Sequence, residues 1–247
     1  MKIKMHTVYF SFLSLLFSIL FPLFVSQGDA ESTAEQEQLF IANMVKAYGG
    51  KEQLAKVRGI SAEGLITSST DGKGSYYRYM QPDGKLYVHI RYSDSSEKRI
   101  LNGTNGYRGF DGRIRKVIGA PYDAMVYQYN QLDLPFGLMN GTFRILEHRQ
   151  DKLNGVNVEV LKLADKHGYE IEVYISARNY HILKVVGYFT IGQKKASLGV
   201  EFMDYRKVKG ILLAHKAINY AMDSRISETQ IAQYTINPKI DTSIFNP

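Results

Sequence analysis

Cysteine is missing from this chain, and so is tryptophan. The lack of cysteine excludes a disulfide framework, a thiolate zinc site, an iron–sulfur cluster, a cysteine nucleophile and a lipidated N-terminal cysteine. A block of one charge sign is also missing, since the formal net charge of +7 is spread along 247 residues. This charge fits association with anionic surfaces, but it does not by itself indicate a nucleic-acid partner.

Apolar and aromatic residues, in contrast, are plentiful. Hydrophobic residues make up 45% of the chain, charged residues 22% and aromatic residues 12%. This balance is too apolar for a disordered chain and too charged for a protein with several membrane-spanning helices. The length favours one domain, or two, and single all-β domains often reach this size.

The first thirty residues have the layout of a secretory signal peptide. A basic start precedes an apolar run from Val8 to Val25, and small residues such as Gly28 and Ala30 then offer a cleavage site. We therefore expect export, with residues 1–30 removed and residues 31–247 forming one domain with a net charge of +6. The alternative is an uncleaved N-terminal anchor, because the apolar run is just long enough to span a bilayer.

The hydrophobic periodicity changes from helical to extended near Val57. Apolar residues recur at helical spacing from Leu39 to Tyr48 and are followed by a Gly-Gly pair, which is a C-cap signal, and residues 51–56 predict a second short helix. Beyond Ile60 the period is two and turn signals are frequent, so hairpin-linked strands are expected. The clearest strands are predicted within residues 65–68, 77–79, 86–92, 107–110, 156–160, 171–175, 182–191, 198–205, 212–220 and 226–236.

One helix interrupts these strands. Pro121 to Leu132 has a proline in its first turn and places Met125 and Tyr129 on one stripe, and we expect it to end near Asp133 and be followed by an exposed apolar loop at 134–138. Strands joined by tight turns are antiparallel. The sequence therefore predicts a mainly β (α+β) fold, a large curved antiparallel sheet covered on one side by a few helices.

Catalytic signatures are absent from the sequence. There is no nucleophile elbow, zinc-protease motif, phosphate-binding loop or dinucleotide-binding glycine motif. The histidines stand alone without a second ligand at suitable spacing, so no metal site is predicted. Glu170 and Glu172 share a strand face opposite Ile171 and Val173, which is the pattern of a solvated face rather than of an acid–base pair. We expect no enzyme activity, no catalytic residues and no cofactor.

Aromatic residues stand on both faces of several strands, and a sheet that is apolar on both faces must be covered twice. One interpretation is packing of the sheet edges under loops. The other is a concave face that holds an apolar ligand, with tyrosine hydroxyls that tolerate water when the cavity is empty. On the second interpretation the candidate cavity or lid residues are Tyr79, Tyr87, Tyr107, Phe110, Met125, Tyr129, Phe136, Leu138 and Phe189.

Three stretches of the chain carry a recognisable family pattern. They are Met44–Gly50 near the start of the mature chain, Phe202–Arg206 followed by Gly210–Leu213, and the ending Ile236–Asp241. Together they resemble the outer-membrane lipoprotein-sorting (LolA/LolB-like) superfamily. The resemblance implies a half-open antiparallel barrel closed by helices, located in the bacterial periplasm, with a hydrophobic cavity for acyl chains or an apolar peptide.

Two functional hypotheses follow. The first is a monomeric periplasmic carrier that holds a hydrophobic ligand, either a lipid or the acyl chain of a lipoprotein, with the helices around Val45 and Met125 and the segment 134–138 as its lid. The second is a non-enzymatic envelope interaction or sensor module that binds a partner protein. A carrier predicts an open apolar cavity, whereas an interaction module predicts a filled core. No nucleic-acid partner is expected, and secretion beyond the periplasm is left open.

Overall fold

The computed structural model describes residues 27–191 and 194–247. The predicted signal peptide therefore lies outside the described residues, apart from Gln27 to Ala30, which begin the first helix. The helices are α1 (Gln27–Ala47), α2 (Lys51–Ala55), α3 (Ala120–Asn140) and a 3-10 turn, η1 (Thr242–Phe245). The strands are β1 (Ile60–Ser68), β2 (Gly72–Gln81), β3 (Lys85–Arg91), β4 (Ser96–Asn102), β5 (Asn105–Phe110), β6 (Arg113–Val117), β7 (Arg144–Leu153), β8 (Val156–Ala164), β9 (Glu170–Ser176), β10 (Ile182–Ile191), β11 (Lys194–Val208), β12 (Ile211–Ala221) and β13 (Ser224–Ile236).

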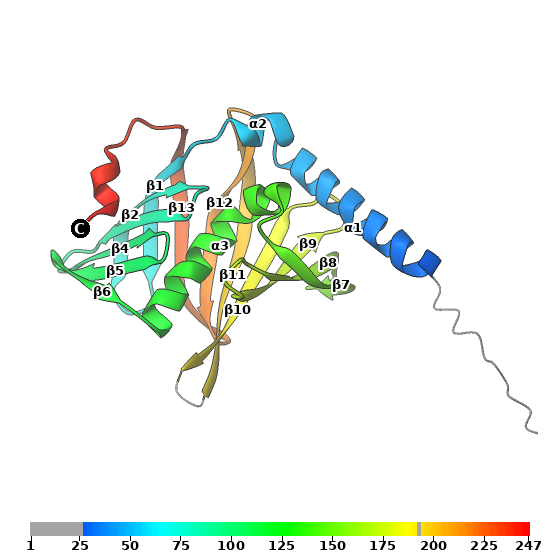
Figure 1. The fold of residues 1–247 in the computed structure, drawn as a ribbon. Coiled ribbons are helices and arrows are strands. Elements are labelled where there is room, and N and C mark those ends of the chain that lie inside the picture. Colours follow the sequence, from blue (N-terminus) through cyan, green and yellow to red (C-terminus); the bar gives the residue numbers. More distant parts are fainter. Residues whose placement is uncertain (1–26, 192–193) are drawn as a thin grey trace, which may run out of the picture.

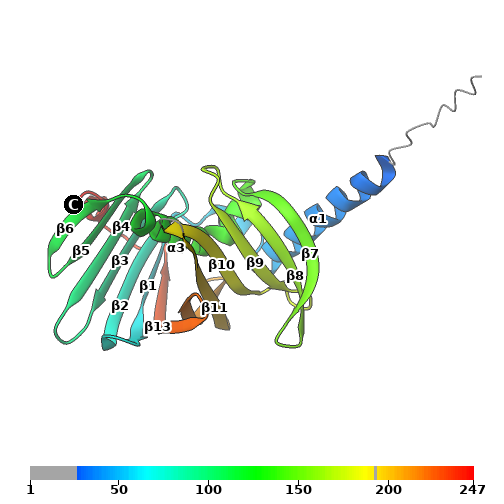
Figure 2. The same ribbon diagram turned by 90° about the horizontal axis from the view of Figure 1, so that it is seen from below.

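These strands form one antiparallel sheet that curves around α3 (Figures 1 and 2). The strand order is β6-β5-β4-β3-β2-β1-β13-β12-β11-β10-β9-β8-β7, so β1 joins the N-terminal strands to the C-terminal ones. The two ends of the sheet, β6 and β7, do not pair with each other within the described residues. The predicted curved antiparallel sheet is confirmed, and it is an open half-barrel.

The main core lies between the concave face of this sheet and α3. Strand alternation places Leu86, Val88 and Ile90 of β3 on the core side, and the predicted stripe on β9 (Ile171–Ile175) is buried as well. Glu170 and Glu172 point to the other face of β9, where they contact Lys162 and Arg149. Glu170 is exposed, as the sequence interpretation of that face expects, whereas Glu172 is partly buried.

The prediction for the end of α3 is wrong. The helix does not end near Asp133 but continues through Pro135 to Asn140, and a left-handed Gly141 follows it. The segment 134–138 is helical and buried rather than an exposed loop: Phe136 is 3% exposed and Leu138 8%. Proline removes one helical hydrogen bond, but the burial of large apolar side chains on both sides of it offsets that loss.

Helix α3 is attached to β10 by a buried tyrosine. The Tyr127 hydroxyl donates a hydrogen bond to the Val185 carbonyl oxygen at 3.0 Å, and its ring packs edge-on against Phe189. Gly187 makes room for this ring, because a Cβ atom at that position would lie 2.5 Å from Tyr127. The absence of a side chain at residue 187 therefore sets how closely the helix approaches the sheet.

Replacing Tyr127 with phenylalanine removes this hydrogen bond and keeps the ring. We expect the free energy of unfolding to fall by about 1 kcal/mol, the usual net value of such a bond. Urea denaturation followed by far-UV circular dichroism measures the change. The matched control is Tyr188→Phe, because Tyr188 is exposed and its hydroxyl contacts only Glu172 on the surface. Equal losses in both variants would contradict an anchoring role for Tyr127.

The bounds of three strands, β4, β6 and β7, and of part of a helix were not predicted from the sequence. Strands β6 and β7 are rich in charged residues and lack a clear alternation, and they are the edge strands of the sheet. Charge on an edge strand discourages pairing with another chain, which explains why these strands do not show a buried-strand pattern. Helix α1 also begins at Gln27, earlier than the predicted start near Glu35.

Candidate ligand-binding cavity

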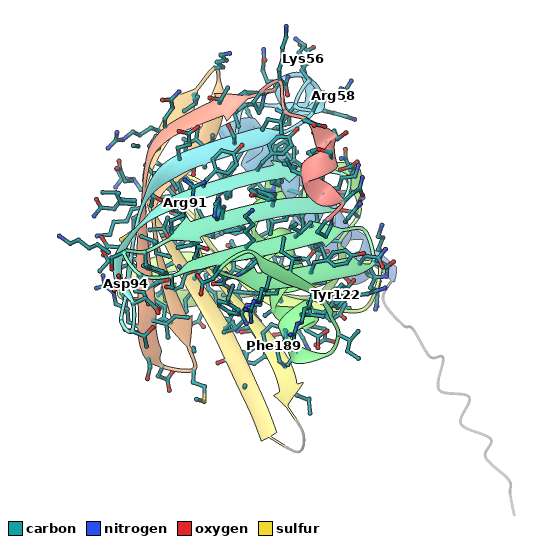
Figure 3. The ribbon with its side chains drawn as sticks, turned by 90° about the vertical axis from the view of Figure 1, so that its left-hand side faces the viewer. Lys56, Arg58, Arg91, Asp94, Tyr122 and Phe189 are labelled. Atoms are coloured by element: carbon teal, nitrogen blue, oxygen red, sulfur yellow. The ribbon has the colours of Figure 1, made fainter. Side chains whose placement is uncertain are left out.

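A cavity of about 540 Å³ lies between α3 and the concave face of the sheet. It is reached from the end of the half-barrel where β1 turns into β2 and β3 into β4, which Figure 3 shows by the position of Arg91 and Asp94. We call this space the outer cavity. Its apolar lining comes from Ile66, Ile90, Phe110, Met125, Tyr127, Leu198 and Ile226.

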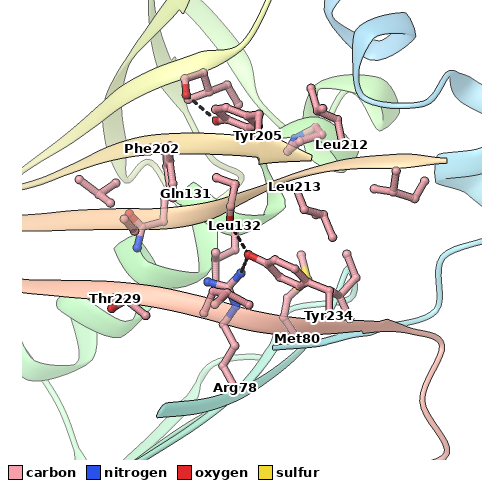
Figure 4. Close-up of a pocket in the computed structure, with 18 of the residues that line it drawn as sticks. Arg78, Met80, Gln131, Leu132, Phe202, Tyr205, Leu212, Leu213, Thr229 and Tyr234 are labelled. Atoms are coloured by element: carbon pink, nitrogen blue, oxygen red, sulfur yellow. Dashed lines mark hydrogen bonds between the residues drawn. The ribbon is translucent and has the colours of Figure 1, made fainter. Parts of the chain in front are cut away.

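A smaller space of about 100 Å³, the inner cavity, lies between α3 and strands β1, β2 and β10 to β13 (Figure 4). Its walls are mostly apolar: Leu54, Ile60, Met80, Leu132, Pro135, Phe136, Val200, Phe202, Ile211, Leu212, Leu213, Ala217 and Ile231. Tyr76, Gln128, Gln131 and Asn219 line both the inner and the outer cavity. The two spaces are therefore neighbours, and these four side chains lie at their boundary.

A third space, of about 500 Å³, lies at the opposite end of the strands, near Arg58 in Figure 3. It shares Leu54 and Phe136 with the inner cavity. Phe136 thus stands between the inner cavity and this second opening. The three spaces therefore follow one another along α3.

The buried Tyr48 and the partly buried Tyr205 fix the wall of the inner cavity at β10 and β11. The Ile182 N–H donates to the Tyr48 hydroxyl at 3.0 Å, Tyr48 donates to the Tyr205 hydroxyl at 3.2 Å, and Tyr205 donates to the Ile182 carbonyl oxygen at 2.5 Å. Burial raises the pKa of Tyr48 to about 12, and burial also raises the pKa of Tyr205 well above its usual value. Both phenols therefore stay protonated and keep donating their hydrogen bonds. These bonds tie the chain at the end of α1 to the sheet.

Arg78 is the one charged residue among those that line the inner cavity. It is partly buried, and its Nη2 donates to the Tyr234 hydroxyl at 3.1 Å. Tyr234 in turn donates to the Ala214 carbonyl oxygen at 2.6 Å. Figure 4 shows the guanidinium beside Leu132 and the Tyr234 ring. A neutral phenol thus holds this cation in place.

A compact ion-pair network borders the outer cavity. Glu97 accepts two hydrogen bonds from Arg99, at 2.8 and 2.7 Å, and one from Arg108 at 2.6 Å. Burial raises the pKa of the Glu97 carboxyl, but the two guanidinium groups more than offset that effect, and its pKa lies below the usual value. Both arginines are thus neutralised in part by a carboxylate inside the protein, unlike Arg78.

The structure places three of the nine predicted residues on a cavity wall. Phe110 and Met125 line the outer cavity, and Phe136 lines the inner cavity and the opening near α2. Tyr129 and Leu138 are buried in the main core, and Phe189 packs partly buried against it. A role for any of them in ligand binding stays a prediction.

The other three predicted residues, Tyr79, Tyr87 and Tyr107, lie away from these cavities. They form a cross-strand row through Ile100, on the face of β2 to β5 opposite Tyr76 and Arg78. The C-terminal turn η1 covers this row with Phe245, whose ring centroid lies 5.8 Å from that of Tyr79. The second apolar face of these strands is therefore covered by the chain's own end.

Residues that the sequence analysis did not single out include Arg78, Gln131 and Ala217. Arg78 carries a weak signal, because residues 76, 78 and 80 share one face of a strand. No group of His, Asp and Glu side chains suited to a metal ion occurs among the described residues. None of the helices in the described part of the chain is long and apolar enough to cross a bilayer.

Comparisons with known proteins address the fold. No family model and no curated protein matches the sequence. Among solved structures, a DUF1329 family protein from Desulfovibrio piger superposes with a TM-score of 0.56 at 13% identity, covering 84% of this chain and 96% of the other. A putative outer membrane lipoprotein-sorting protein domain from Vibrio parahaemolyticus gives 0.54 at 16% identity, with 84% and 95% covered.

The third similar structure is a LolA superfamily protein from Nitrosomonas europaea, with a TM-score of 0.51, 11% identity, and coverage of 84% of this chain and 96% of that one. All three similarities extend over most of both chains. At these identities they establish architecture alone, and they agree with the sequence resemblance. This chain therefore has a LolA-like fold.

Proposed function

We propose that this protein is an exported, periplasmic, non-enzymatic carrier that holds the apolar part of a lipid or of a lipoprotein acyl chain between α3 and the sheet. The observation that carries the proposal is the pair of neighbouring cavities along α3, of which the outer one alone measures about 540 Å³. Ligand sites in proteins usually enclose about 300–1,000 Å³ and are mostly apolar. A module with a filled core would have no such hollow.

The ligand enters through the outer cavity. Two apolar residues of its rim are exposed, Phe110 at 51% and Ile226 at 38%, and they offer contacts to an incoming chain. Lifting α3 away instead would uncover its buried residues at about 25 cal/mol per Å². Entry from the rim leaves that packing intact, so α3 acts as a fixed wall rather than as a lid.

Filling the inner cavity is the direct test of the proposal. Ala217 lines the inner cavity, whereas Ala232 on the neighbouring strand β13 is exposed. We expect Ala217→Phe to weaken the binding of a fluorescent fatty acid roughly tenfold or more, equivalent to about 1.4 kcal/mol, because the ring occupies space that the ligand needs. Ala232→Phe adds the same ring outside and should bind like the wild type.

Native mass spectrometry of the protein purified from its own envelope, followed by lipid extraction, complements this measurement. A co-purifying acyl ligand that is lost in Ala217→Phe supports a carrier. A clean apo mass in the wild type, together with no uptake of fluorescent fatty acid, contradicts a carrier and favours the interaction module. Sequencing the N-terminus of the same sample tests cleavage after Ala30, and fractionation of the cells tests the periplasmic location.

A further inference from the structure

We propose that the cargo is an anionic amphiphile, and that Arg78 binds its carboxylate or phosphate head group inside the half-barrel. This inference rests on the proposed carrier function and names the class of ligand. It starts from an unpaired charge: Arg78 is a cation in an inner cavity whose other lining residues are uncharged. Among the described residues no carboxylate lies within salt-bridge distance of its guanidinium.

The guanidinium group of Arg78 cannot become neutral by losing a proton. It stays charged in proteins and has five N–H donors, of which the structure assigns one, from Nη2, to Tyr234. Removing such a cation from bulk water is costly unless an anion or several acceptors replace the lost hydration. An anionic head group requires hydrogen-bond donors and space. The remaining N–H donors of Arg78 supply the first, and the adjoining cavity supplies the second.

The neighbouring polar residues hold the guanidinium in position, but they neither pair all its N–H donors nor neutralise its charge. Tyr234 accepts from Arg78 and donates to the Ala214 carbonyl oxygen, so its hydroxyl is fixed at both ends. The ring of Tyr234 also stacks with the guanidinium, whose Cζ lies 5.7 Å from the ring centroid. The cation is therefore oriented before any ligand arrives, which reduces the ordering that binding requires.

A second observation comes from Gln131 on α3, at the junction of the inner and outer cavities. The residue is buried, and its Oε1 has no hydrogen-bond partner within the described part of the chain. Buried polar atoms are almost always paired, so this unpaired oxygen marks a place for a hydrogen-bond donor, such as a hydroxyl of the ligand. The Nε2 atom of the same side chain is a donor and suits an oxygen atom of a carboxylate or a phosphate ester.

The sizes of the two cavities set the orientation of the ligand. The inner cavity, of about 100 Å³, accepts a head group but not a long chain, and the outer cavity, of about 540 Å³, accepts the chain. The head group therefore enters first and reaches Arg78, and the chain extends past Gln131 to the apolar rim. The arginines at that rim bind Glu97 already, so they compete less for the anion.

The test compares sixteen-carbon ligands that share a chain and differ in the head group: palmitate, hexadecyl phosphate and the neutral methyl palmitate. Binding is measured by displacement of a fluorescent probe from the delipidated, full mature chain. We expect the wild type to prefer the two anions over the ester by roughly tenfold or more. Stronger binding of palmitate than of hexadecyl phosphate identifies a carboxylate site, and the reverse identifies a phosphate site.

Arg78→Met removes the charge and keeps much of the volume, and it should abolish the preference for anions while methyl palmitate binds as before. The control, Arg115→Met, changes the net charge equally on the exposed strand β6 and should leave all three affinities unaltered. The melting temperature of the apo protein should not fall in Arg78→Met, because the variant removes an uncompensated cation. A merely structural role for Arg78 would lower it.

Each result has one meaning. Equal binding of the ester and the anions by the wild type overturns the head-group inference and leaves the carrier intact. No binding of any of the three ligands overturns the carrier itself. A preference for anions that survives in Arg78→Met overturns the assignment to Arg78, and its loss in Arg115→Met would indicate an effect of net charge instead.

Discussion

Asp133→Asn is expected to stabilise the protein, and the gain should grow as the pH rises. Asp133 lies on α3, is 6% exposed, and leaves its Oδ1 without a hydrogen-bond partner in the described residues. Burial raises the pKa of this carboxyl to about 8, with a smaller contribution from Asp83, while a hydrogen bond from Tyr129 and the charge of Lys166 act in the opposite direction. The acid is therefore neutral in the folded protein at pH 7.

The sign of the pH dependence follows from this raised pKa. The unfolded chain ionises Asp133 near pH 4, whereas the folded chain keeps the proton until about pH 8. Between these values the folded state binds more protons, so the wild-type stability falls as the pH rises and levels off above pH 8. At about 1.4 kcal/mol per pKa unit, roughly four units set an upper limit of about 6 kcal/mol.

Asparagine has the shape of the protonated acid and cannot ionise. Urea denaturation of both proteins at pH 4, 6 and 9 should show similar stabilities at pH 4 and a gap that widens toward pH 9. Asp94→Asn, on the exposed turn seen in Figure 3, is the control and should follow the wild type. Parallel pH profiles for wild type and Asp133→Asn would show that Asp133 is ionised in the folded protein.

Phe245→Ala is expected to lower the free energy of unfolding by about 3–5 kcal/mol, the usual loss for a large buried aromatic side chain. Phe245 is 2% exposed and packs on the row formed by Tyr79 and Ile100. Its loss opens a cavity there and releases η1, which Asp241 caps by accepting a hydrogen bond from the Ser243 N–H at 2.9 Å. The outer face of β2 to β5 then loses its cover.

Ligand binding provides the contrast, because Phe245 and the cavities lie on opposite faces of these strands. We expect Phe245→Ala to bind fatty acid like the wild type at temperatures where it stays folded. Phe110→Ala, the same substitution at a half-exposed rim residue, should do the reverse: a small change in stability and weaker binding. A loss of stability below 1 kcal/mol in Phe245→Ala would show that η1 does not hold this face.

The strands were predictable because their signals are local. Turn residues such as Pro82-Asp83-Gly84 and the alternation of Ile171, Val173 and Ile175 depend on a few neighbouring residues, and the structure confirms both. The end of α3 was not predictable in this way. Pro135 is a local signal against a helix. Phe136 is buried against residues distant in the chain, and this burial outweighs the local signal.

The sequence predicted the class of site, an apolar cavity, but only three of the nine residues chosen for it line one. Alternation shows that Tyr79 and Arg78 lie on opposite faces of β2, yet it cannot show which face is concave. That choice depends on the curvature of thirteen strands and on where α3 and η1 pack. The aromatic residues chosen from the sequence therefore divide between the cavity, the core and the row beneath Phe245.

The strand order determines when the sheet can be completed. Every neighbouring pair of strands is consecutive in the chain except β1 and β13, in which Ile60 pairs with Ile236 and Ser68 with Ser227. Hairpins form within microseconds, but a pairing between distant segments waits for closure of a long loop and slows folding. Each half of the sheet can therefore assemble as a local meander, whereas the seam between them closes only after the last strand is available. Until β1 and β13 pair, both strands present unpaired edges, and newly synthesised chains are then most prone to mispairing with one another.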